Sequence, residues 1–166
     1  MDGLTRVLRN RQHAIVERWC QDALAVYSSR AALVFAREQD QFANPIGHSL
    51  RTGTRAVFEA LLDGADDERI RRALDDILRT RAIQQLAPSA AVEFLFHLKD
   101  VIRQELGSAS NEAVCSHDLT EFMRRIDHAV LMAFDVYVAY RERLCELRIN
   151  EVKRTIPWSV GRRKTG

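Results

Sequence analysis

Two polar side chains fall on a predicted helix face that is otherwise apolar, and their position needs a physical reason. Arg81 lies four residues after Ile77, so both share one face of the helix, and Gln84 follows on the same side. A buried guanidinium group needs carboxylate or carbonyl acceptors. Arg81 is therefore predicted either to tie its helix to a neighbour, through helix-end carbonyls or a carboxylate such as Asp63 or Asp100, or to bind an acidic ligand or a partner's carboxylate.

Two further candidates belong to a strongly apolar segment. Lys99 is in line with Leu95 and Ile102, and it either extends its aliphatic stem to the surface or serves as a ligand or switch residue. His97 lies within the run Phe94–Leu98, and a histidine in an apolar helix raises the question of haem ligation. The simpler interpretation is a hydrogen-bonded imidazole in the core or at its boundary.

Motifs for catalysis and for nucleic-acid binding are absent from the sequence. It contains no glycine-rich phosphate loop, no G-x-S-x-G turn and no H-E-x-x-H zinc motif. The segment Cys115–Asp118 holds a cysteine and a histidine but no second ligand pair, which is weak evidence for a metal. Apart from Trp158, no aromatic residue is interleaved with the basic tail. We therefore expect no enzyme, no cofactor, no metal and no nucleic-acid partner.

Length and composition predict one ordinary soluble domain. The 166 residues are 46% hydrophobic and 29% charged, with a net charge of +2, which argues against disorder. Residues 141–166 carry eight Lys or Arg and three Glu, so this end could contact an acidic partner. The three distant cysteines, the absence of a long apolar run and the charged N-terminus predict a cytoplasmic protein with no disulfide framework, membrane span or signal peptide.

The elements that must position these residues are all helices. Apolar residues recur at helical spacing almost throughout, and the few prolines and glycines stand at element boundaries. No convincing strand pattern is found. The predicted helices are Thr5 to Tyr27, a short one around Leu33 to Phe35 capped by Ser28 or Ser29, Asn44 to Gly64, one that starts at Asp66 or Asp67, Pro88 to Gly107, and Ser116 to about Thr155.

The last predicted helix is unusually long for a domain of this size. A helix from Ser116 to Thr155 would measure about 58 Å, more than such a domain needs to cross itself. Two interpretations stay open: the helix bends at an unrecognised point, or its end packs on a partner, with a second copy of the chain favoured. We expect residues 1–156 to form the domain and residues 157–166 to form a basic tail.

Several short motifs resemble the RsbT co-antagonist RsbRD N-terminal domain family, and together they span about residues 5–155. The resemblance rests on the F-x-N-P-x-G motif at Phe42–Gly47, the L-L-x-G stop at Leu61–Gly64, the R-x-R-A-[IV]-Q motif at Arg79–Gln84, Pro88–Val92 with the later Lys99, and, in the last helix, Asp135–Tyr137, Arg141–Glu142 and Asn150–Glu151.

The resemblance implies an all-helical sensor domain, globin-like but without haem, and often dimeric. In the family this domain commonly precedes a STAS domain that binds a switch kinase, whereas here we expect a stand-alone module with no STAS domain. The resemblance assigns no catalytic residue. It adds Tyr137, which belongs to the matching C-terminal motif, to the candidate ligand or partner residues.

The sequence therefore predicts a non-enzymatic regulatory protein with an all-α, single-domain helical bundle. Its candidate site residues are Arg81, Gln84, His97, Lys99 and Tyr137. The predicted partners are a second copy, bound through the C-terminal helix, and a STAS-domain protein or serine/threonine kinase. The alternative is a globin-like sensor that binds haem or a small molecule through His97.

Overall fold

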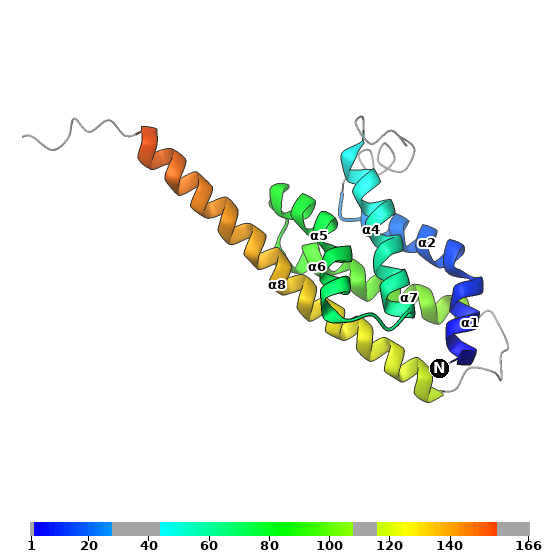
Figure 1. Cartoon of the computed structure of the whole chain (residues 1–166). Helices are drawn as coiled ribbons and strands as arrows, with labels where there is room; N and C mark the ends of the chain where they lie inside the picture. Colours follow the sequence, from blue (N-terminus) through cyan, green and yellow to red (C-terminus); the bar gives the residue numbers. More distant parts are fainter. Residues whose placement is uncertain (1, 28–43, 108–115, 156–166) are drawn as a thin grey trace, which may run out of the picture.

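Six shorter helices gather along one half of a very long C-terminal helix, and the other half of that helix projects beyond them (Figure 1). The computed structural model describes residues 2–27, 44–107 and 116–155. Within these ranges it contains helices and no strand. The helices are α1 (Asp2–Asn10), α2 (Gln12–Leu24), α4 (Pro45–Leu62), α5 (Asp67–Ile83), α6 (Pro88–Val92), α7 (Phe94–Gly107) and α8 (Ser116–Thr155). The all-α prediction is confirmed.

Local capping chemistry explains where α4 and α5 begin. The Asn44 side chain accepts a hydrogen bond from the Gly47 amide at 2.8 Å, and Asp66 does the same for Arg69 at 2.9 Å. Such bonds satisfy amides that a helix N-terminus leaves without partners. At the other end of α4, Gly64 adopts φ +64°, the left-handed conformation that glycine tolerates best. These boundaries agree with the sequence prediction.

The core lies where α5 packs against α4 on one side and α8 on the other. Its largest fully buried side chains include Trp19, Phe58, Phe94 and Tyr137. Helices α4 and α5 cross closely at Gly53, where an added Cβ would lie 2.5 Å from Ile77 Cγ1. Glycine is needed at that crossing because a larger residue would clash with Ile77, and not because the backbone has an unusual conformation.

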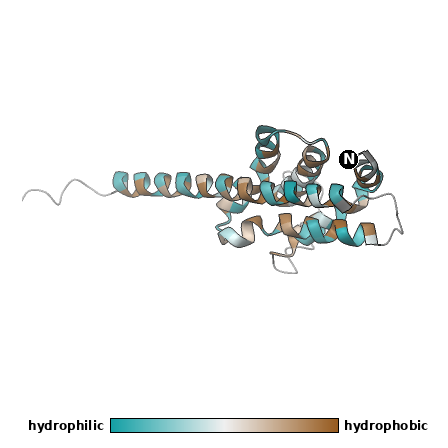
Figure 2. Cartoon of the chain, turned by 90° about the horizontal axis from the view of Figure 1, so that it is seen from below, coloured by the Kyte–Doolittle hydropathy of each residue, from teal (hydrophilic) through white to brown (hydrophobic). Residues whose placement is uncertain are grey.

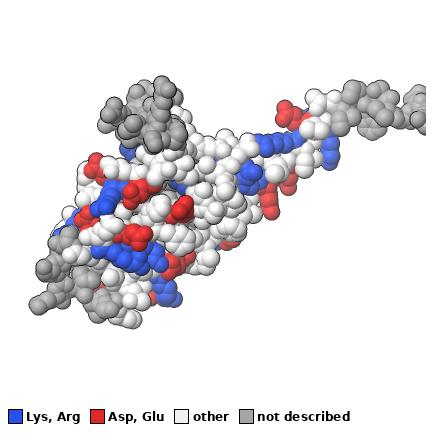
Figure 3. Space-filling model, turned by 180° about the vertical axis from the view of Figure 1, so that it is seen from behind, with Lys and Arg blue, Asp and Glu red and all other residues white. Residues whose placement is uncertain are grey.

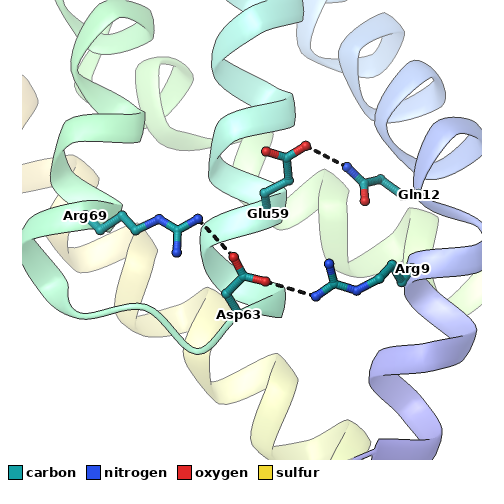
Figure 4. Close-up of polar contacts among 5 residues, drawn as sticks. All are labelled: Arg9, Gln12, Glu59, Asp63 and Arg69. Carbon is teal, nitrogen blue, oxygen red and sulfur yellow. Dashed lines mark hydrogen bonds and ion pairs between the residues drawn. The ribbon is translucent and has the colours of Figure 1, made fainter.

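Charged groups fasten the outer corner of the bundle, where α1, α4 and α5 meet. Asp63, just after α4, accepts from Arg9 and Arg69 at 2.9 Å each, and Gln12 donates to Glu59 at 2.9 Å (Figure 4). The hydrogen bonds from Arg9 and then Arg69 lower the pKa of Asp63. Exposed pairs of this kind contribute little to stability. We therefore expect these contacts to add little to the free energy of unfolding.

The first predicted helix, Thr5 to Tyr27, is wrong as a single element. It is divided at Arg11, whose φ of −104° and ψ of 6° leave the helical region. No proline or glycine marks the break. The Arg11 side chain instead donates to the backbone carbonyl of Glu105 in α7, so a contact distant in sequence holds the kink.

The predicted helix Pro88 to Gly107 is also divided, into α6 and α7 at Glu93. In an unbroken helix, the carbonyls of Ala90 and Ala91 would accept from the amides of Phe94 and Leu95. Here both carbonyls accept from the Arg81 side chain. The break is thus part of the arrangement around Arg81.

Helix α8 is continuous over 40 residues, about 60 Å. The interpretation that it bends or breaks is wrong for Ser116–Thr155. Every residue from 145 to 155 is exposed, and apolar residues recur along the projecting part (Figure 2). Of the described helices, none is long and apolar enough to cross a bilayer. The short helix expected around Leu33 to Phe35 and the tail 157–166 lie outside the described residues.

Candidate functional site

Arg81, in the last turn of α5, is 1% exposed and binds three backbone carbonyls. Its Nη1 donates to Ala90 at 2.9 Å and Ala91 at 3.1 Å, and its Nη2 donates to Ala23 at 2.9 Å. Ala23 belongs to the last turn of α2, and the two other carbonyls stand at the break between α6 and α7. One guanidinium group thus joins three elements. Within the described chain, no carboxylate forms an ion pair with it.

Aromatic side chains complete the surroundings of this guanidinium group. Its carbon lies 4.7 Å from the centre of the Phe94 ring, a cation–π contact. Trp19 stacks on the same ring with 5.7 Å between centroids and donates its indole N–H to the Phe94 carbonyl at 2.5 Å. Burial lowers the pKa of Arg81. Arginine nevertheless stays protonated in proteins, so the core contains a permanent positive charge.

Gln84 and Tyr137 fasten the same end of α5. The Gln84 side-chain oxygen accepts from the Tyr27 hydroxyl at 2.6 Å, which ties α5 to the end of α2. Tyr137 of α8 is fully buried, and its hydroxyl donates to the Leu86 carbonyl. Arg141 adds a bond to the Ala82 carbonyl at 3.3 Å. Three predicted residues, Arg81, Gln84 and Tyr137, therefore converge on residues 81–86.

His97 and Arg81 both line one small cavity. The cavity has a volume of about 200 Å³ and lies among α2, α5 and the α6–α7 break. His97 Nε2 is 3.9 Å from Glu93, and its Nδ1 is buried without a hydrogen-bond partner. Pockets for drug-sized ligands measure roughly 300–1,000 Å³, so this cavity has no room for a haem macrocycle. Of the ligands considered for His97, the cavity could hold a small molecule of a few atoms but not haem.

Lys99 is not part of this group. Its ammonium lies 2.7 Å from the Asp127 carboxylate and joins α7 to the first half of α8. Only 16% of the Lys99 side chain is exposed, while Asp127 is about half exposed. The lysine is thus an inter-helix contact near the surface. Cys115, of the faint metal motif, lies outside the described residues, and no group of three metal-ligating side chains occurs among the described ones.

Tyr140 forms one more contact between α8 and α5, and we expect its phenol to keep its proton to about pH 12. Burial, and then the 2.6 Å hydrogen bond to Asp75, raise the pKa of Tyr140 from 10.0 to about 12. Because the folded-state pKa is the higher one, its stabilising effect is complete below pH 10.0 and is lost as the pH rises to about 12. A tyrosinate absorbance titration of Tyr140→Phe should lack the transition at about pH 12. A transition at about pH 12 that persists in Tyr140→Phe would contradict the assignment.

A line of five apolar side chains and one thiol, all exposed except the half-buried Val138, runs along α8 and is here called the outer stripe. Its members follow steps of three, four and seven residues, which place them within a sector of about 60° on the helix. The outer stripe consists of Leu131, Phe134, Val138, Cys145, Ile149 and Val152. Leu131 is 67% exposed, and Ile149 and Val152 are more than half exposed. This stripe was not predicted, although the helical spacing of its members is visible in the sequence.

Charges of opposite sign border the outer stripe. Helical geometry puts Glu142, Glu146 and Lys153 on one flank, and puts Arg148 on the other together with Arg141, which also bonds the Ala82 carbonyl. Figure 3 shows both signs of charge on the projecting part of α8. The structure therefore contains two separate candidate sites, the cavity beside Arg81 and the outer stripe.

The comparisons with known proteins agree with the sequence motifs. Residues 13–152 match the model of the family described as RsbT co-antagonist protein rsbRD N-terminal domain. An uncharacterised protein of Archaeoglobus fulgidus is 31% identical over 80 residues, which are 48% of this chain and 49% of that protein. The chain thus matches about half the length of this curated relative. No solved structure matches, and the globin-like arrangement stays a prediction.

Proposed function

Because this chain belongs to the RsbT co-antagonist protein rsbRD N-terminal domain family, we propose that it is a non-enzymatic regulatory domain of stress signalling that acts by binding other proteins. The observation that carries this proposal is the outer stripe, which begins beside the bundle and continues onto the projecting part of α8. Its members on the projecting part, Cys145, Ile149 and Val152, are exposed, and no other described element covers them. An exposed apolar stripe of this kind is typical of an interaction site.

The occupant that fits the outer stripe best is a second copy of the chain. A helix that carries apolar residues at steps of three and four buries them well against an identical helix. The flanks also favour a parallel pair. In a parallel pair the acidic flank (Glu142, Glu146) faces the flank of the second copy that contains Arg148, whereas an antiparallel pair brings like flanks together.

We expect the protein to be a dimer that Ile149→Glu dissociates. A carboxylate in the middle of an apolar contact must be desolvated, which we expect to weaken dimerisation about 100-fold or more. Leu147→Glu is the matched control, because Leu147 is also 59% exposed but lies on the opposite side of α8. Sedimentation equilibrium should give a monomer for Ile149→Glu and a dimer for Leu147→Glu. Equal behaviour of the two variants would sink the proposal.

Disulfide cross-linking through Cys145 tests the parallel orientation. In a parallel pair the two Cys145 thiols lie at the same height of the interface, while an antiparallel pair centred elsewhere separates them. Cys145 is exposed and Cys20 is buried. Mild oxidation of a Cys115→Ser protein should therefore give a covalent dimer that Cys145→Ser abolishes. A non-covalent dimer that never cross-links would contradict the parallel arrangement.

The downstream partner we propose is a STAS-domain protein or a serine/threonine kinase, with the complex in the cytoplasm. The support is the family relationship, because the domain resembles the sensor part of stress-response co-antagonists. A tagged full chain should recover such a protein from the host lysate. Recovery of only the chain itself would remove this partner and leave the dimer proposal in place.

A further inference from the structure

The two flanks of the outer stripe differ in shape where the stripe runs beside the bundle. One flank faces α7, because Asp127 bonds Lys99 there at 2.7 Å and Phe134 follows two helical turns later on the same side of α8. Phe134 is 46% exposed. The other flank faces α5, because His128 lies 3.0 Å from Asp67 at the start of that helix. The α7 flank thus carries a projecting phenyl group.

The α5 flank carries a pocket of about 530 Å³, formed by α4, the turn after it, the start of α5 and the first half of α8. Pockets that hold small molecules measure roughly 300–1,000 Å³, so this one has room for a phenyl ring. Charged side chains, among them Asp67 and Arg124, line part of it. Its apolar wall consists of Ala60, Leu61, Ala65, Ile70 and Leu131, the first member of the outer stripe.

A parallel pair of copies brings the two flanks together. Its two-fold axis runs along the outer stripe, so the α7 flank of each copy faces the α5 flank of the other. Equivalent residues then stand at the same height, which places Phe134 about 4.5 Å along the axis from Leu131 of the second copy. A helical side chain points toward the N-terminus of its own helix, and for Phe134 this is the direction of the pocket.

We propose that Phe134 of each copy enters this pocket of the other, so that a second copy is the occupant of the pocket. The inference rests on the proposed dimer and names its anchor and the receptor for that anchor. An aromatic side chain in a pocket, with charged groups around it that exclude water, is typical of the residues that dominate binding energy. Phe134 lies between Leu131 and Val138 in the stripe, so its burial continues the apolar contact.

Removal of the anchor is the first test. Phe134→Ala should weaken dimerisation of the full chain at least about 10-fold in sedimentation equilibrium. Leu147→Ala is the control, because it also shortens an exposed apolar side chain but lies on the opposite side of α8, and it should dimerise as the wild type does. Circular dichroism checks that both variants keep the fold. Equal dimer affinity of the two variants would overturn the proposal.

A pocket-filling variant tests the receptor. Ala65→Leu adds carbons at the pocket wall and should also weaken dimerisation at least about 10-fold. Once Phe134→Ala has removed the ring that competes for this space, Ala65→Leu should have little further effect. Effects that add fully in the double variant, or an unchanged affinity for Ala65→Leu, mean that the pocket receives something other than Phe134, such as a small molecule, and they overturn the proposal.

A photoreactive analogue identifies the contact directly. Copies with p-benzoylphenylalanine in place of Phe134 are mixed with isotopically labelled wild-type copies, irradiated, digested and measured by mass spectrometry. We expect cross-links to residues 60–70 of the labelled copy, the stretch that supplies most of the apolar wall. Cross-links within one copy, or to the stripe alone, overturn the proposal. A dimer that Ile149→Glu dissociates but that gives no pocket cross-link removes only this inference, whereas a monomeric wild type removes the proposed dimer as well.

Discussion

Replacing Arg81 with leucine should lower the free energy of unfolding by about 3–5 kcal/mol. The change leaves the carbonyls of Ala23, Ala90 and Ala91 without their donor in a site that is buried or partly buried. It also removes the cation stacked on Phe94. Urea denaturation followed by circular dichroism measures the loss, and wild-type stability for Arg81→Leu would contradict the role assigned to this residue.

Arg79→Leu is the matched control for that measurement. Arg79 lies two residues away on the same helix, has a side chain 54% exposed, and pairs with the exposed Asp76. Exposed ion pairs of this kind are worth about 0–1 kcal/mol. The two variants therefore make the same chemical change in the same helix, and only burial and carbonyl bonding separate their expected effects.

Gly53→Ala should lower the free energy of unfolding by about 1–3 kcal/mol, the range for overpacking a filled core. The new methyl group would lie 2.5 Å from Ile77 Cγ1 and 2.6 Å from Ile77 Cδ1, so α4 and α5 must move apart or Ile77 must leave its rotamer. Ile77 is 1% exposed, so other side chains surround it. Thermal and urea denaturation of the variant should both show the loss.

Two further variants make that result specific. Gly107→Ala is the control, because an added Cβ there meets nothing within 4 Å, and its effect should stay within about 0.5 kcal/mol. The double variant with Ile77→Ala should be less destabilised than the two single effects together, since the clashing atoms are gone. Strict additivity would show that the clash is not the cause of the Gly53→Ala loss.

Sequence patterns predict the helix boundaries that depend on neighbouring residues. The cap at Asn44, the start after Asp66 and the stop at Gly64 all follow from side chains that bond amides three residues away, or from the freedom of glycine. The residues that form such contacts are close in sequence. These helix boundaries can therefore be predicted before any tertiary structure is known.

The breaks at Arg11 and Glu93 could not be read in this way. Neither site has a proline or glycine, and local helical propensity runs through both. The first break depends on a bond from Arg11 to Glu105, and the second on bonds from Arg81 to Ala90 and its neighbour. These are tertiary contacts, and they override the local pattern.

The candidate site was predicted in part. The position of Arg81 on an apolar face identified a buried guanidinium group, but no pattern could show that its acceptors would come from three different elements. Tyr137 was chosen from a family motif, and the structure places it against the end of α5 that contains Arg81. Lys99 shares the apolar setting of the others, yet its partner Asp127 lies elsewhere.

Because α8 is unbroken, a small tilt of the helix at the bundle produces a larger displacement at its far end. Its last side chain packed against the core is Leu144, and about 17 Å of helix extend from there to Thr155. A tilt of roughly 10° at that point would carry the far end through about 3 Å. Side chains lose contact beyond about 4.5 Å, so a rearrangement too small to disturb the core would be enough to make or break contacts at the tip.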